Sequence, residues 1–196
     1  IVDKSSPFYG DYINDSSKGS NGGTSDTLAI SLNSGFGTYP QSLCPYNEVK
    51  KGFSETLRYY SDYRLKDYSE ISNNKDTLKS KIVSNGAVTV YYPSITDCYS
   101  SDYANYYSDN TCIGIGDAHL IVVVGWDDNY SKDNFTGKVK PSNDGAWLCK
   151  NSWGEHYGND GYIWISYDTT KLAFSQYIMQ DNNAYDNEYQ NCFVTQ

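Results

Sequence analysis

The segment GAWLCKNSWGEHYGNDGYIWISY, Gly145 to Tyr167, is the part of the sequence that decides the fold. Two short apolar runs stand on either side of a turn that is rich in glycine and asparagine. Aromatic and β-branched residues favour strands, and glycine with asparagine favours tight turns. The segment therefore predicts two neighbouring antiparallel strands. The polar Asn151 lies between the first strand and Trp153, and this position needs an explanation.

The composition indicates a packed, acidic domain. The 196 residues are 38% apolar and 16% aromatic, which suits one sizeable folded unit. The net charge of -9 argues against a nucleic-acid partner, because binding a phosphate backbone needs clustered Lys and Arg. No apolar run approaches the roughly 20 residues of a membrane-spanning helix. The richness in polar residues and tyrosine, with 21 Tyr, favours a secreted or cell-surface protein.

Local patterns predict further elements on the N-terminal side of this segment. Apolar residues at helical spacing, Asp76 in the first turn and Gly86 at the end predict a helix at about 75–85. The β-branched run GAVTVYY that follows predicts a strand. The run HLIVVVGWDD, which begins at His119, predicts a strand too apolar to be exposed. The second half of the chain is therefore expected to be mainly antiparallel sheet.

The chain has five cysteines, an odd number: Cys44, Cys98, Cys112, Cys149 and Cys192. In an oxidising compartment an odd count leaves one thiol free or bonded to another chain. Two of them bracket a polar, tyrosine-rich loop, and we expect a disulfide between Cys98 and Cys112. Closing such a loop would stabilise the fold by about 3 kcal/mol in the chain-entropy model.

A polar insertion, DDNYSKDNFTGKVKPSND, separates two of the predicted strands. Its first residues alternate like a calcium-binding loop, at Asp127, Asn129, Ser131 and Asp133. However, Lys132 stands where such a loop needs glycine, and Lys138 stands where it needs a bidentate glutamate. We therefore expect a solvated hairpin loop, and neither a metal nor a cofactor.

The chain has only two histidines, His119 and His156. His119 opens an apolar strand, where a core histidine with its hydrogen bonds satisfied is the plain structural alternative. If the strands before Asn151 and after His119 are neighbours, the ring and the amide meet at one end of the sheet. The amide oxygen would then orient the imidazole, and Trp153 would shield the bond from water. This pair would be the orienting half of a nucleophile, base and orienter arrangement. His156, by contrast with His119, is expected in an exposed turn.

Four segments resemble papain-like cysteine proteases, in the order of that family. DAHLIVVVGWDD resembles the family's histidine strand, and AWLCKNSWGEHYGNDGYIWISY its asparagine segment. NGGTSDTLAISLNSGFGTYPQSLCPYN is similar to its glycine pair, short helix and Pro-Tyr turn, and YRLKDYSEISNNKDTLKSKIVSNGAVTVYY to its helix and following strand. The insertion and the ending NNAYDNEYQ look most like the bacterial branch that often precedes lectin-like or surface-anchoring domains.

The resemblance implies an α+β papain-like fold in a single catalytic domain over residues 1–196. Residues 1–85 would form a mainly helical lobe, incomplete here, packed on a β-barrel-like antiparallel sheet lobe of residues 86–196. It also implies that His119 is the general base, that Asn151 orients it and that Trp153 covers the pair.

The same resemblance implies a substrate-binding edge and a specificity pocket. Gly22 and Gly23 would line the edge along which an extended peptide pairs its backbone. Ala118 and Tyr91 would line the second specificity pocket, which hints at apolar side chains in that subsite. The substrate would be a peptide or protein.

The nucleophile is where the sequence departs from the family. There a helix-opening cysteine, preceded by a glutamine of the oxyanion hole, comes well before the glycine pair. The 21 residues before Gly22 contain neither residue type. Cys149 is near Asn151 in sequence, but it does not open a predicted helix, and we interpret it as a structural thiol.

Two hypotheses follow from this departure. In the first, the chain is the His- and Asn-bearing large chain of a papain-like cysteine endopeptidase. A separate N-terminal chain would supply the Cys and the Gln, and the isolated chain would be inactive. In the second, it is a noncatalytic papain-like domain that serves as a binding or surface scaffold. The first is favoured because a scaffold does not need an intact orienting pair.

Overall fold

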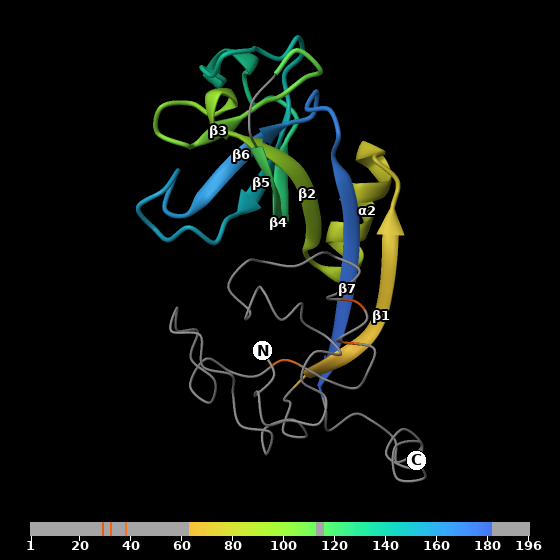
Figure 1. The fold of residues 1–196 in the computed structure, drawn as a ribbon. Coiled ribbons are helices and arrows are strands. Elements are labelled where there is room, and N and C mark those ends of the chain that lie inside the picture. Colours follow the sequence, from red (N-terminus) through yellow and green to blue (C-terminus); the bar gives the residue numbers. More distant parts are fainter. Residues whose placement is uncertain (1–28, 30–31, 33–37, 39–62, 113–115, 182–196) are drawn as a thin grey trace, which may run out of the picture. The chain divides into compact units, whose positions relative to one another are not determined.

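The computed structural model describes residues 63–112 and 116–181, together with Ala29, Leu32 and Thr38. Contacts within the chain divide it into two compact units, residues 69–176 and the remainder. The second half of the chain is mainly sheet. One helix packs beside this sheet, in the unit of residues 69–176 (Figure 1). The α+β class expected from the sequence is confirmed.

Seven strands form one sheet in the order β1-β7-β2-β4-β5-β6-β3. Their bounds are β1 Tyr63–Ile71, β2 Val88–Ile95, β3 Asn105–Tyr106, β4 Gly116–Asp127, β5 Ala146–Lys150, β6 Tyr162–Ser166 and β7 Ala173–Asp181. The pairs β7–β2, β2–β4, β4–β5 and β5–β6 are antiparallel, and β6–β3 is parallel. Over the described residues this sheet does not close into a barrel. Two short 3-10 helices, Thr96–Cys98 and Lys132–Asn134, lie in the connections.

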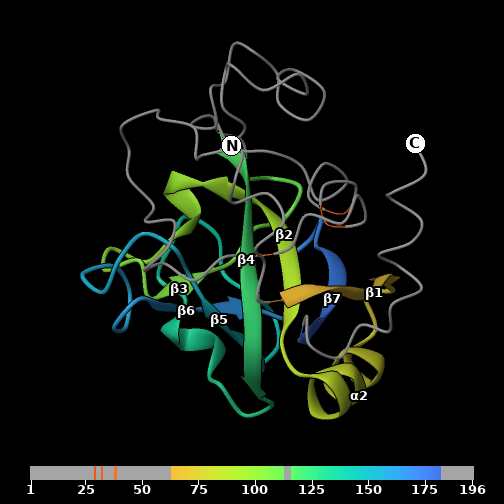
Figure 2. The ribbon, with the colours of Figure 1, turned by 90° about the horizontal axis from the view of Figure 1, so that it is seen from below.

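Helix α2, Lys75–Asn85, has the bounds that the sequence predicted. It begins after Asn74, whose side chain accepts a hydrogen bond from the backbone N–H of Thr77. It ends at Gly86, whose φ of 88° is readily adopted only by glycine. The buried Gln176 of β7 donates to the Gly86 carbonyl at 3.1 Å. In Figure 2 the helix lies beside one end of β2.

The pairing of β2 with β4 sets the inner face of the sheet. Val88 lies opposite Val123, and Val90 opposite Ile121, and all four side chains are buried. The other face carries residues that stay open to solvent, with Val124 38% exposed. The prediction that this strand is too apolar to be exposed was therefore wrong at Val124, whereas Leu120 and Val122 on the same face are half-buried.

Candidate active site

Strand pairing places His119 and Asn151 on the inner face at one end of β4 and β5. His119 lies directly opposite the buried Tyr92 of β2. Cys149 of β5 pairs with Val123 of β4 and is buried on the same face. Because side chains alternate along a strand, Asn151, two residues further, turns to this face as well. Its backbone N–H donates to the Gly161 carbonyl at 2.9 Å and so fixes the end of the strand.

The imidazole and the amide meet in a direct hydrogen bond. His119 Nε2 lies 2.9 Å from Asn151 Oδ1, and the Ser152 backbone N–H donates to the same oxygen at 2.7 Å. A backbone N–H can only donate, so this amide atom must be the acceptor oxygen. His119 Nε2 therefore carries a proton. Among the described residues, no hydrogen bond engages the other ring nitrogen, Nδ1, which is left free for chemistry.

Aromatic rings cover the imidazole on two sides. Trp153 stacks on His119 with 5.0 Å between ring centroids and 12° between the planes. Tyr92 approaches the ring edge-on, at 5.7 Å and 61°. Both neighbours belong to the hydrophobic core or pack against it. The hydrogen bond to Asn151 is part-buried beneath these rings, and its protection from water by Trp153 stays a prediction.

A layer of tyrosines behind Trp153 was not predicted. Tyr99 and Tyr103 lie 5.7 Å and 6.1 Å from its ring centroid, and Tyr157 lies at 5.9 Å. Two of these, Tyr99 and Tyr103, come from the loop between Cys98 and Cys112. The high tyrosine content of that loop was the only signal in the sequence.

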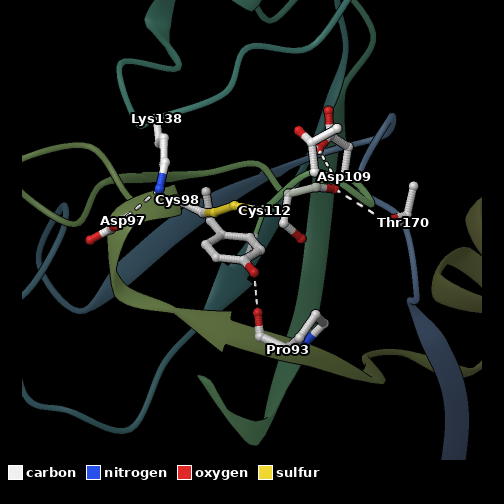
Figure 3. The surroundings of a disulfide bond; sticks show 10 residues. Pro93, Asp97, Cys98, Asp109, Cys112, Lys138 and Thr170 are labelled. Carbon is white, nitrogen blue, oxygen red and sulfur yellow. Dashed lines mark hydrogen bonds and ion pairs between the residues drawn. A yellow bond between two sulfur atoms is a disulfide. The ribbon is translucent and has the colours of Figure 1, made fainter. Parts of the chain in front are cut away.

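The disulfide Cys98–Cys112 is present and closes this loop (Figure 3). Just before it, Asp97 forms an ion pair of 3.5 Å with Lys138 of the polar insertion. Gly137 must be a glycine, because a Cβ there would lie 2.7 Å from the Cys98 carbonyl oxygen. The disulfide loop and the insertion are therefore held tightly together.

The structure describes only two of the four residues expected to bind substrate, Ala118 and Tyr91. Ala118 and Tyr91 are exposed and share a face of the β2–β4 pair, the face opposite to His119. Leu120, which the sequence analysis did not single out, lies directly opposite Tyr91 and joins the same face. Gly22 and Gly23 lie outside the described residues.

The fold gives the other candidate residues ordinary structural settings. Cys149 is fully buried, and burial raises the pKa of its thiol, so it is not a reactive nucleophile. His156 is exposed in its turn. Asp127 accepts a hydrogen bond from the Asn129 backbone N–H, which explains the polar alternation there as a turn. Within the described ranges, no three potential metal-ligating side chains gather, and no helix is long and apolar enough to cross a membrane.

Comparisons with known proteins point to one family. The family model described as papain family cysteine protease matches residues 11–185. A solved structure of the clostridial cysteine protease Cwp84 superimposes with a TM-score of 0.71 at 30% identity, covering 86% of this chain and 44% of that one. A second Cwp84 structure, with TM-score 0.70 and 30% identity, covers 86% of this chain and 40% of that one; it contains cysteine protease and lectin-like domains, and it is described as a surface layer associated protein of Clostridium difficile.

Mammalian proteins are among the curated relatives. Procathepsin L of Rattus norvegicus is 29% identical over 158 residues, which are 77% of this chain and 42% of that protein. Testin-2 of Mus musculus is 27% identical over 120 residues, which are 60% of this chain and 34% of that protein. The chain thus spans less than half the length of these relatives.

Proposed function

Because the chain belongs to the papain family of cysteine proteases, we propose that it is the His- and Asn-bearing part of a cysteine endopeptidase. The observation that carries the proposal is the hydrogen bond between His119 Nε2 and Asn151 Oδ1 under the ring of Trp153. This bond leaves Nδ1 as the nitrogen that exchanges protons with a thiol and a substrate. His119 is then the general base and acid, and Asn151 is its orienter.

The reaction is acyl transfer through a thioester. A thiolate, having lost its proton to His119 Nδ1, attacks the peptide carbonyl carbon and forms a tetrahedral intermediate. The intermediate collapses, the C–N bond breaks, and the imidazolium gives its Nδ1 proton to the leaving amine. Water then attacks the thioester, His119 Nδ1 takes a proton from that water, and the acid and the thiol group are released. Asn151 keeps the ring in one orientation throughout both steps.

The nucleophile in this proposal comes from a companion N-terminal chain that carries the Cys and the oxyanion-hole Gln. Among the described cysteines, Cys98 and Cys112 are bonded to each other and Cys149 is buried. None of them combines an exposed thiol with a helix N-terminus, which is what lowers a thiol pKa in this type of site. The isolated chain is accordingly inactive.

The substrate is an extended peptide, and the protein acts as a secreted or surface enzyme. Gly22 and Gly23 would pair with the peptide backbone, and Ala118 with Tyr91 would favour apolar side chains in the second specificity pocket. The similarity to Cwp84, a surface layer associated protein, supports the localisation.

The alternative is a noncatalytic scaffold, and one experiment separates the two functions. Intact mass spectrometry of native material, with a peptide hydrolysis assay on the same sample, tests for a second polypeptide with a helix-opening cysteine. We expect that polypeptide to accompany the 22.1 kDa chain and hydrolysis to depend on it. A sample that contains only this chain and still binds a surface partner would support the scaffold.

A further inference from the structure

The imidazole of His119 is held between two rings, Trp153 and Tyr92, and a third residue connects the two. Tyr99 lies 5.7 Å from Trp153, centroid to centroid, and its hydroxyl lies 2.7 Å from the Tyr92 hydroxyl. It is buried, with 6% of its surface exposed. Apart from His119 itself, Tyr99 is the only residue in the described part of the chain that contacts both rings that flank the imidazole.

The hydroxyl of Tyr99 is fixed from two directions. Besides the Tyr92 hydroxyl it meets Ser94 Oγ, at 2.9 Å, so three hydroxyl groups form a short chain. Ser94 and Tyr92 are two residues apart on β2 and therefore share its inner face. Burial raises the pKa of Tyr99 to about 12, so its phenol stays neutral and keeps both hydrogen bonds at neutral pH. Such a network defines a ring orientation more sharply than apolar packing alone.

We propose that Tyr99 is a positioning residue for His119: its hydroxyl network with Tyr92 and Ser94 holds the stacked Trp153 and the edge-on Tyr92 at fixed angles. This inference rests on the proposed function for its consequence in catalysis, but its geometric part does not. If the ring of Tyr99 turns more freely, Trp153 tilts more, and water reaches the hydrogen bond between His119 and Asn151 more often.

The chain offers a matched control in Tyr106. Its ring also lies in the cluster, 4.6 Å from Tyr99 and 4.9 Å from Tyr92. Its hydroxyl donates to the Pro93 carbonyl instead, and no described contact joins it to Trp153 or to His119. Tyr106→Phe therefore removes one buried hydroxyl from the same cluster without loosening the connection between Trp153 and Tyr92.

The Nε2–H proton of His119 is the direct probe. The chain has only two histidines, so exposed His156 is an internal reference in a proton NMR spectrum. We expect Tyr99→Phe to speed solvent exchange of this proton about fivefold, as the loss of about one net hydrogen bond would do. Ser94→Ala, which leaves the ring intact, should raise the rate less, and Tyr106→Phe should leave it unchanged.

Peptide hydrolysis by the protein with its nucleophile chain gives the second readout. Tyr99→Phe should lower kcat about fivefold with KM unchanged, because it disturbs the base and not the substrate contacts. Unchanged exchange in Tyr99→Phe, or an equal rise in Tyr106→Phe, would overturn the proposal and reduce Tyr99 to a packing role. Absence of hydrolysis in the unsubstituted protein would contradict the proposed function, while the exchange rates would still decide the role of Tyr99.

Discussion

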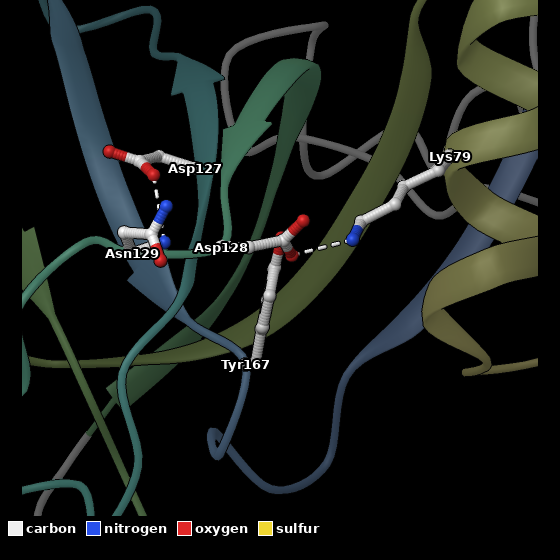
Figure 4. A network of polar contacts seen from close by, with 5 residues as sticks. All are labelled: Lys79, Asp127, Asp128, Asn129 and Tyr167. Atoms are coloured by element: carbon white, nitrogen blue, oxygen red, sulfur yellow. Dashed lines mark hydrogen bonds and ion pairs between the residues drawn. The ribbon is translucent and has the colours of Figure 1, made fainter.

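The two ends of strand β4 carry polar clusters of opposite character. Beyond the C-terminal end, Asp128 forms an ion pair with Lys79 of α2 and accepts a hydrogen bond of 3.0 Å from the Tyr167 hydroxyl (Figure 4). The Asp128 side chain is 56% exposed, and its charge has partners within the chain. Near the N-terminal end, His119 is partly buried and covered by aromatic rings.

The two clusters differ in whether their polar atoms all have hydrogen-bond partners among the described residues. At the His119 end, the Nδ2 atom of Asn151 is buried without a hydrogen-bond partner among the described residues. Nδ1 of His119 likewise makes no hydrogen bond to the described part of the chain. Buried polar atoms are normally satisfied, so the Nδ2 atom of Asn151 has hydrogen-bonding capacity that the described residues do not use. The complete cluster holds α2 to the sheet, whereas the incomplete cluster is suited to chemistry.

The largest effect should come from removing the imidazole. His119→Ala should lower kcat about 10²–10⁴-fold, because it deletes the proton-transfer group. His156→Ala, which removes the exposed histidine, should leave peptide hydrolysis unchanged. Steady-state kinetics of the two variants checks this, and similar losses in both would contradict the contrast between the two histidines.

Removing the disulfide should mainly affect stability. The bond closes a loop with a sequence separation of 14, and replacing both cysteines with serine should lower the free energy of unfolding by about 3 kcal/mol. Asp97→Asn, which breaks the neighbouring exposed ion pair, should cost less than about 1 kcal/mol. Urea unfolding measures both variants. Equal losses would mean that the disulfide does not order the loop.

Alkaline pH should lower the free energy of unfolding, because the buried phenol of Tyr99 then tends to lose its proton. Burial is the main reason that the pKa of Tyr99 rises from its ordinary value of 10.0 to about 12 in the fold. The folded state therefore holds the phenol proton more tightly, so this contribution to stability is complete below pH 10 and is lost as the pH rises towards about 12. Tyr99→Phe should flatten that fall in an unfolding series. If the stability of this variant falls as steeply with pH as that of the unsubstituted protein, groups other than Tyr99 cause the fall.

The smallest effect should come from the complete cluster. Lys79→Met removes an exposed ion pair, so it should change the free energy of unfolding by about 0.2–1 kcal/mol, less at high salt, and leave kcat unchanged. The hydrogen bond from Lys79 lowers the pKa of Asp128, so this small contribution exists above the ordinary carboxyl range and is lost as the pH falls. Thermal unfolding at two salt concentrations measures it, and a loss of catalysis would remove the contrast between the ends of β4.

Local signals explain what the sequence could predict. The bounds of helix α2 could be predicted from the sequence, because the residues that cap it lie within a few positions of its ends. Strand β1 was missed because only Leu65 and Ile71 of its nine residues are buried, so its apolar pattern is weak. The tyrosine layer was missed because Tyr99 and Tyr103 belong to a polar loop. Only folding of that loop against Trp153 buries Tyr99 and half-buries Tyr103, and no spacing in the sequence records this contact.

The central claim is that His119 and Asn151 serve a thiol from outside these 196 residues. Labelling of the native protein with a thiol-directed epoxide, followed by peptide mapping, tests it most directly. We predict one adduct, on a helix-opening cysteine of the companion chain, and a much slower reaction in the His119→Ala variant. An adduct on a cysteine of this chain, or an equal labelling rate without His119, would contradict the account.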